Sequence, residues 1–209
     1  MPDPSCCACE DLHLRDSHDD EVQPVNYVAL LRGINVGGRN TIKMTELKAS
    51  FEAMGFAAVA TYIQSGNVLF RTSRSDGVEL SAEIEDALTR SFGFDLRIVV
   101  VSGRQLAATV ARAPEGFGEA PDKFRYDVIF LRKPLRSAEA LEGWNPKPGV
   151  DTVHAGSGVI YVSRLTSKAA QSRLTKIIQL PTYQNMTIRN WNTTTKLLAL
   201  MTMDDAKSD

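Results

Sequence analysis

Cysteine is absent from the last 200 of the 209 residues. The three cysteines of the chain, Cys6, Cys7 and Cys9, lie close together near the N-terminus, so no disulfide crosslinks the remainder. Their spacing lacks the paired two-residue intervals of ordinary zinc sites. We therefore expect no metal site and no cofactor, and we expect a reducing, cytoplasmic location.

Long apolar runs and common catalytic motifs are also missing. No segment approaches the ~18 consecutive apolar residues of a membrane span, and no signal peptide opens the chain, so we expect no membrane partner. His154 is the single histidine after residue 24, and neither a G-x-S-x-G elbow nor an H-E-x-x-H zinc motif occurs. These absences exclude several common hydrolase classes and leave open whether the protein is an enzyme.

The formal net charge is only −1, but the charges are unevenly distributed along the chain. Residues 1–24 hold seven acids and one base, whereas residues 123–203 hold twelve bases and four acids. The acidic segment lacks hydrophobic periodicity, and we expect a disordered leader at 1–24 and a short tail at 204–209. The basic half either is an ordinary solvated surface or faces an anionic partner.

Hydrophobic periodicity begins at Asn26 and repeats once along the chain. In residues 25–113 it predicts strands at 27–31, 59–63, 67–71 and 96–101 and helices at 44–54 and 78–92, followed by a helix near 105–112. Residues 114–203 show the same order, with strands at 126–131, 151–154, 159–162 and 186–188 and helices at 138–141 and 167–178. A last helix at 193–203 lies outside the repeat.

This order predicts an α+β fold of two tandem βαββαβ units, a duplicated ferredoxin-like architecture with an extra C-terminal helix. The first unit is expected at residues 25–113. The second unit and the C-terminal helix are expected at 114–203, after a link rich in proline and glycine.

Three sequence motifs stand out along the chain: YVALLRGINVGG at 27–38, TYIQSGNV at 61–68 and TIRNWNT at 187–193, followed by Lys196-Leu197-Leu198. Together they resemble the bacterial domain-of-unknown-function family 1697, over residues 26–203. The resemblance implies a bacterial cytoplasmic protein of duplicated ferredoxin-like build, and it implies no activity. The segment through Pro24 departs from the usual start of that family.

Polar side chains of these motifs are the candidate ligand-binding residues, because each motif lies where a predicted strand begins or ends. They are Arg32, Asn35, Gln64, Ser65, Asn67, Arg189, Asn190, Asn192 and Lys196. Arginine, asparagine and glutamine make paired hydrogen bonds to carboxylates, phosphates or base edges. The alternative is that these side chains only tie loops together. Asn192 is a predicted helix N-cap, and Trp191 is expected in the core.

Two further features favour an anionic ligand. The glycines of residues 33–38, flanked by arginines, either present backbone N–H groups to a phosphate or form a long turn. A basic patch of Lys168, Arg173 and Lys176 lies on the helix predicted at 167–178, which carries no acid. The sequence thus predicts a protein that binds an anionic ligand, a nucleotide or a nucleic acid. The alternative is an enzyme that acts on a phosphorylated or carboxylated small molecule without a metal or a Cys or Ser nucleophile.

Overall fold

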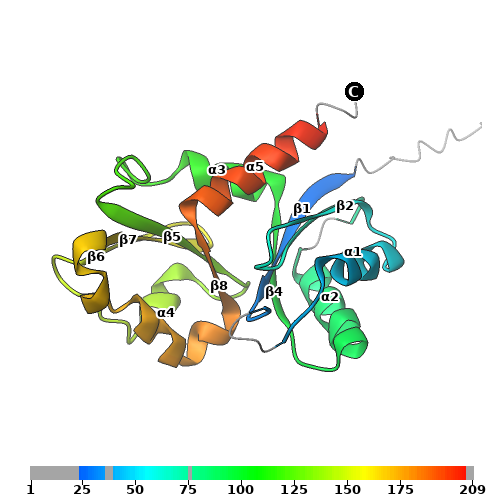
Figure 1. Ribbon diagram of the computed structural model, residues 1–209, viewed down its shortest axis with the longest axis horizontal. Coiled ribbons are helices and arrows are strands. Elements are labelled where there is room, and N and C mark those ends of the chain that lie inside the picture. Colours follow the sequence, from blue (N-terminus) through cyan, green and yellow to red (C-terminus); the bar gives the residue numbers. More distant parts are fainter. Residues whose placement is uncertain (1–23, 36–39, 75–76, 206–209) are drawn as a thin grey trace, which may run out of the picture.

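The computed structural model describes residues 24–35, 40–74 and 77–205, and it has the α+β fold that the sequence predicts (Figure 1). Two four-stranded antiparallel sheets form its frame. Apart from Pro24, the expected disordered leader lies outside the described residues, as do residues 206–209 of the expected tail. No helix within the described ranges is long and apolar enough to cross a membrane.

The first sheet and its helices occupy the first half of the chain. Their elements in chain order are β1 (Val25–Arg32), α1 (Met44–Ala53), β2 (Ala57–Tyr62), β3 (Asn67–Thr72), α2 (Gly77–Phe92) and β4 (Arg97–Ser102). The strands lie in the order β2-β3-β1-β4, so β4 is an edge strand. Each element is within a few residues of its predicted position.

The second sheet follows α3 (Gly103–Ala111). Its elements are β5 (Phe124–Leu131), α4 (Ser137–Leu141), β6 (Asp151–Ala155), β7 (Val159–Leu165) and β8 (Met186–Asn190), and the chain then enters α5 (Trp191–Asp205). The strands lie in the order β6-β7-β5-β8. The first, second, third and fourth strands of each half therefore occupy corresponding places in the two sheets.

One predicted helix is wrong. Residues 167–178 do not form an α-helix, and three short 3-10 segments replace it: η1 (Thr166–Gln171), η2 (Leu174–Gln179) and η3 (Pro181–Asn185). The cause lies at Arg173, whose backbone N–H donates to the Asp151 carboxylate at 2.9 Å and whose carbonyl accepts from the Trp144 indole at 3.0 Å. Asp151 thus takes the N–H that a helical ladder would use, and the carbonyl is shared between the Trp144 indole and a local 3-10 bond from the Lys176 N–H at 3.0 Å. No α-helical ladder therefore passes this residue.

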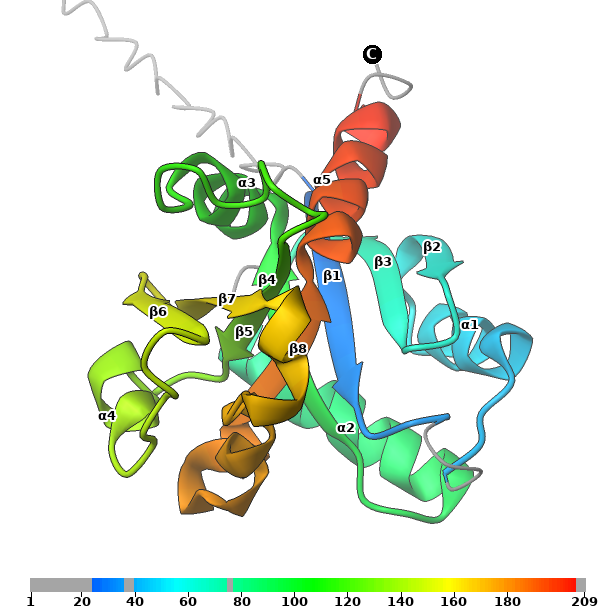
Figure 2. The ribbon, with the colours of Figure 1, turned by 60° about the vertical axis from the view of Figure 1, so that its left-hand side comes forward.

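Three hydrophobic clusters hold the layers together. Side chains alternate across β1, so Ala29 and Leu31 pack towards α1 and α2 while Val28 and Leu30 face the second sheet. Figures 1 and 2 show α1 and α2 on the far side of the first sheet, α4 on the far side of the second, and α3 beside α5 at one end between them. The two sheets therefore face each other across a shared apolar layer.

Candidate functional site

The three sequence motifs meet at Arg189, near the end of β8. Its guanidinium is buried and donates hydrogen bonds to oxygens of both earlier motifs: Leu31 O at 2.7 Å, Ser65 O at 3.0 Å, Gly66 O at 3.1 Å and Asn67 Oδ1 at 2.6 Å. Burial lowers the pKa of Arg189 to about 10, which leaves the side chain cationic at neutral pH. All these acceptors are uncharged. Arg189 thus ties the second sheet to the β1 end and to the β2–β3 turn.

Two predicted amide side chains are likewise bonded within the chain. Asn35 has a left-handed backbone (φ 55°); its Nδ2 donates to Ile42 O at 3.1 Å and to Gln64 O at 3.0 Å, and its Oδ1 accepts from the Ile42 amide. Asn67 is fully buried and donates to Tyr62 O at 2.9 Å. These contacts favour the loop-tying alternative for both residues. Residues 36–39 of the glycine-rich loop lie outside the described residues.

Asn190, not Asn192, caps α5. The Asn190 Oδ1 accepts from the Thr193 backbone N–H at 2.7 Å, which is the geometry of an N-cap. The prediction of Asn192 as the cap is wrong, because β8 runs directly into a helix that begins at Trp191. Trp191 packs edge-on against Phe117 in the layer between the sheets, as expected of a core residue.

The other predicted ligand-binding residues do not converge into one buried site. Arg32 donates to the Tyr183 carbonyl and lies 4.7 Å from the centre of its ring. Four are exposed: Gln64, Ser65, Asn192 and Lys196. In the basic patch, Lys168 and Lys176 are exposed on separate 3-10 segments, while Arg173 is half-buried.

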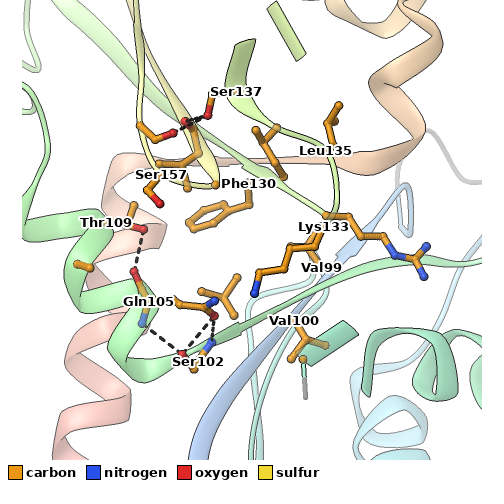
Figure 3. A pocket seen from close by; sticks show the side chains of 18 of the residues that line it. Val99, Val100, Ser102, Gln105, Thr109, Phe130, Lys133, Leu135, Ser137 and Ser157 are labelled. Carbon is orange, nitrogen blue, oxygen red and sulfur yellow. Dashed lines mark hydrogen bonds between the residues drawn. The ribbon is translucent and has the colours of Figure 1, made fainter. Parts of the chain in front are cut away.

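A large cavity lies elsewhere, between the two halves. Its volume is about 1060 Å³. One wall is formed by the second half of β4 and by α3, and the other by the end of β5, residues 132–136 and the β6–β7 hairpin (Figure 3). In that view the Lys133 side chain extends into the cavity towards the β4 wall. We call this space the intersheet cleft.

The lining of the intersheet cleft carries charge of one sign. Arg112, Arg132, Lys133 and Arg136 line it, and no acidic residue does so within the described ranges. Arg132 forms an ion pair with Glu85 of α2 at 2.9 Å. The other three side chains have no carboxylate partner among the residues that the structure describes. Arg112, Lys133 and Arg136 are therefore exposed cations without an ion-pair partner in the described chain, although the Glu139 carboxylate accepts from the Arg136 backbone N–H at 3.2 Å.

Glu85 of α2 does not line the cleft, but it holds in place Arg132, one of the cations that do. Burial raises the pKa of the Glu85 carboxyl above its usual value, against the hydrogen bond from the Ile98 amide and the charges of Arg132 and Arg97. The Ile98 N–H donates to Glu85 Oε1 at 2.7 Å. Glu85 thereby joins α2, β4 and the end of β5, which positions residues 132–136.

Hydroxyl and amide groups of the cleft walls mostly serve the backbone. Ser102 and Gln105 form a capping box at the start of α3, and Thr109 Oγ1 donates to Gln105 O at 2.9 Å. Ser137 Oγ donates to the Gly156 carbonyl and so holds the β6–β7 hairpin at the mouth of the cleft. These groups shape the walls.

The sequence predictions did not include the cleft, although one of its charged segments could have been recognised in the sequence. Residues 132–136 place three bases directly after a predicted strand, within the basic half of the chain. That run was the available signal. Arg112 supplies the charge of the other wall, and no neighbouring residue in the sequence indicates that it belongs to a site. Among the described residues, no group of three or more His, Cys, Asp or Glu side chains could hold a metal ion, and the three cysteines lie outside them.

Comparison with known proteins identifies the family. The family described as "Protein of unknown function (DUF1697)" matches residues 25–161. The chain belongs to this family. The DUF1697 match contains every residue that lines the intersheet cleft, whereas the third sequence motif, at 187–198, lies beyond it.

A solved structure resembles this DUF1697 protein over most of its length. It is that of the conserved bacterial protein SP0830 from Streptococcus pneumoniae, with a TM-score of 0.72 and 24% sequence identity over 86% of this chain and 99% of that chain. At this identity the likeness shows a shared fold. No curated protein matches the sequence.

Proposed function

We propose that this protein binds a small anionic ligand in the intersheet cleft. The observation that carries the proposal is the set of Arg112, Lys133 and Arg136, three cations without a carboxylate partner in the described chain, around a cavity that no described acid lines. Cations that line a recess attract anions more strongly than the same cations on an open surface, because the low-dielectric protein around the recess focuses the field.

The size of the cleft suits a ligand larger than a simple ion. Small-molecule sites usually measure about 300–1,000 Å³. At about 1060 Å³ the intersheet cleft stands at the upper end of that range, with room for a phosphate together with an attached organic group. Lys133 supplies a compact charge inside this space, and arginine supplies forked donors that match phosphate or carboxylate oxygens.

The cleft is preferred to the two sites predicted from sequence. The guanidinium of Arg189 donates to acceptors of the chain, and Lys168 and Lys176 of the basic patch lie on separate 3-10 segments that do not line the cleft. A binding role for the exposed motif residues, Gln64, Ser65, Asn192 and Lys196, stays a prediction. A nucleic-acid partner at the basic patch also stays a prediction, and its signature would be a steep salt dependence.

Isothermal titration calorimetry with inorganic pyrophosphate tests the proposal. The wild-type protein is compared with a Lys133→Ala, Arg136→Ala double variant and with a matched Lys168→Ala, Lys176→Ala control that removes the same number of charges from the patch. We expect at least a tenfold loss of affinity in the cleft variant and less than a twofold change in the control, since each lost charged contact weakens binding severalfold. Equal losses in both variants would contradict the proposal.

We further propose that the chain is a duplicated ferredoxin-like protein, with units at 25–113 and 114–203. The proposal is supported by the same relative strand order in both antiparallel sheets. The 3-10 segments η1, η2 and η3 then stand where the first unit has α2. The expected cytoplasmic location belongs to the same proposal, and the cleft becomes the space between two copies of one unit.

A further inference from the structure

The exposed edge of the first sheet opens into the intersheet cleft. β4 is an edge strand, and its residues 99–102 line the cavity. An edge strand carries a row of backbone N–H and C=O groups without a neighbouring strand, and proteins usually cover or block such a row. In β4, side-chain acceptors bond the outward N–H groups at two positions, and the position between them is open.

The two blocked positions are Ile98 and Ser102. The Ile98 N–H donates to Glu85 Oε1 at 2.7 Å, and the Ser102 N–H donates to Gln105 Oε1 at 2.9 Å. Both bonds lead away from β1, so both residues belong to non-hydrogen-bonded pairs of the antiparallel β1–β4 ladder. Val100 lies two residues from each, opposite Ala29, and shares their orientation.

The N–H and C=O of Val100 therefore point away from β1, at the lined edge of the cleft. The carbonyl oxygen of Val100 lies near the start of α2, because a Cβ built on Gly77 would be 3.8 Å from it. No described residue forms a hydrogen bond with either outward group. Val100 thus offers one donor and one acceptor, side by side and held rigid by the sheet.

We propose that this backbone pair hydrogen-bonds the edge of a nucleobase, and that the ligand of the intersheet cleft is a nucleotide. The inference rests on the proposed anion site. Every common base has an edge on which a donor and an acceptor are adjacent, the complement of one backbone N–H and C=O. Sugar phosphates, inorganic phosphates and simple carboxylates have no such planar edge.

The remaining walls suit the two ends of a nucleotide. Leu135, which is half-buried, lies on the lining with Val99 of β4 and Phe130 of β5, which expose 6% and 2% of their surface (Figure 3). Leu135 thus supplies most of the apolar surface that these three residues offer to the face of a flat ring. Lys133 extends from the opposite wall and provides charge for the phosphate. Base recognition by backbone and phosphate recognition by side chains are separable, which makes the two parts of the assignment independently testable.

The first experiment varies the ligand. Calorimetry compares AMP, GMP, CMP and UMP with ribose 5-phosphate on the wild-type protein, and then repeats the tightest nucleotide with a methyl group on its pairing edge (N1 of a purine, N3 of a pyrimidine). Two additional hydrogen bonds predict at least about tenfold tighter binding for one nucleotide than for ribose 5-phosphate, and loss of that gain on methylation.

The second experiment varies the protein. Val100→Pro removes the outward N–H, and a proline at such a position leaves the β1–β4 ladder bonds in place. Val100→Ala is the matched control, because it shortens the same side chain and keeps the N–H. Val100→Pro should lose the nucleotide advantage and keep pyrophosphate affinity within twofold, while Val100→Ala keeps both. If far-UV circular dichroism shows that the proline variant misfolds, the inference is tested by the affinity of the wild-type protein for the methylated nucleotide.

The outcomes separate this inference from the proposed function. Pyrophosphate binding that depends on Lys133 and Arg136, with nucleotides no tighter than ribose 5-phosphate, would overturn the nucleotide assignment alone. Loss of dependence on those cations would overturn both. Oligonucleotides that bind far more tightly than any mononucleotide, with a steep salt dependence, would also overturn it in favour of a nucleic acid.

Discussion

Replacement of Arg189 by alanine is the sharpest test of how the two halves are held together. The substitution removes a buried cation and takes the donor from three oxygens, on Leu31, Ser65 and Asn67, while the Gly66 carbonyl keeps its bond from the Leu31 N–H. A net hydrogen bond to a charged group contributes about 1.5–3 kcal/mol, but removal of the cation also ends its desolvation cost. We expect a net loss of about 3–5 kcal/mol in the free energy of unfolding, because each buried oxygen left without a donor costs about 1–3 kcal/mol.

Urea denaturation followed by far-UV circular dichroism measures this loss. Arg189→Lys keeps the charge but not the planar fork of donors, so we expect it to lose about 2–3 kcal/mol. The matched control is Arg125→Ala on β5, an exposed side chain that should change stability by less than about 0.5 kcal/mol.

Two results, one in stability and one in ligand binding, would contradict this role of Arg189. An Arg189→Ala loss below about 1 kcal/mol would refute the role of this residue as a connector between the sheets. The folded Arg189→Lys protein should also bind pyrophosphate within twofold of the wild type. A large loss of affinity there would return Arg189 to the list of ligand-binding residues.

Three other tests concern a glycine, a helix cap and a buried carboxylate. Gly118→Ala should cost about 2–4 kcal/mol in thermal or urea unfolding, because its φ is +93° and a Cβ would stand 2.2 Å from an indole nitrogen; Gly116→Ala, with φ +72° and open space, should cost only about 1 kcal/mol. Asn190→Ala should cost about 1 kcal/mol of stability and Asn192→Ala less than about 0.5 kcal/mol, and equal losses would refute the assignment of the cap. Asp151→Asn should lose stability at neutral pH, with the difference from wild type shrinking as pH falls through and below the usual carboxyl range. Burial alone would raise the pKa of Asp151, but hydrogen bonds and a nearby arginine hold it lower; a difference independent of pH in urea titrations would contradict this.

The strands and most helices could be predicted because their signals are local. The apolar run at 27–31 and the periodicity of 78–92 depend on neighbouring residues alone. The helix expected at 167–178 fails for the opposite reason. Its ladder is interrupted at Arg173 by Asp151 and Trp144, which are distant in sequence.

The candidate site was harder to predict than the fold. The sequence named Arg189 and Asn67 as candidate ligand-binding residues, and the structure bonds them to each other across more than a hundred residues. Side chains that hydrogen-bond two loops together are of the same types as side chains that bind a ligand. The sequence alone therefore could not distinguish these two roles. The open edge at Val100 depends on sheet order and on side-chain blocks at Ile98 and Ser102, neither of which has a sequence signature.

The location of the bound ligand is the most direct test of the central claim. A two-dimensional NMR titration of the nitrogen-15-labelled protein with AMP and with pyrophosphate reports which backbone amides sense each compound. Binding in the intersheet cleft predicts the largest shift changes at residues 99–102, 133–137 and 156–158, with those of residue 100 specific to AMP. Changes centred instead on residues 32–35, 64–67 and 189–196 would contradict the account and place the site at the sequence motifs.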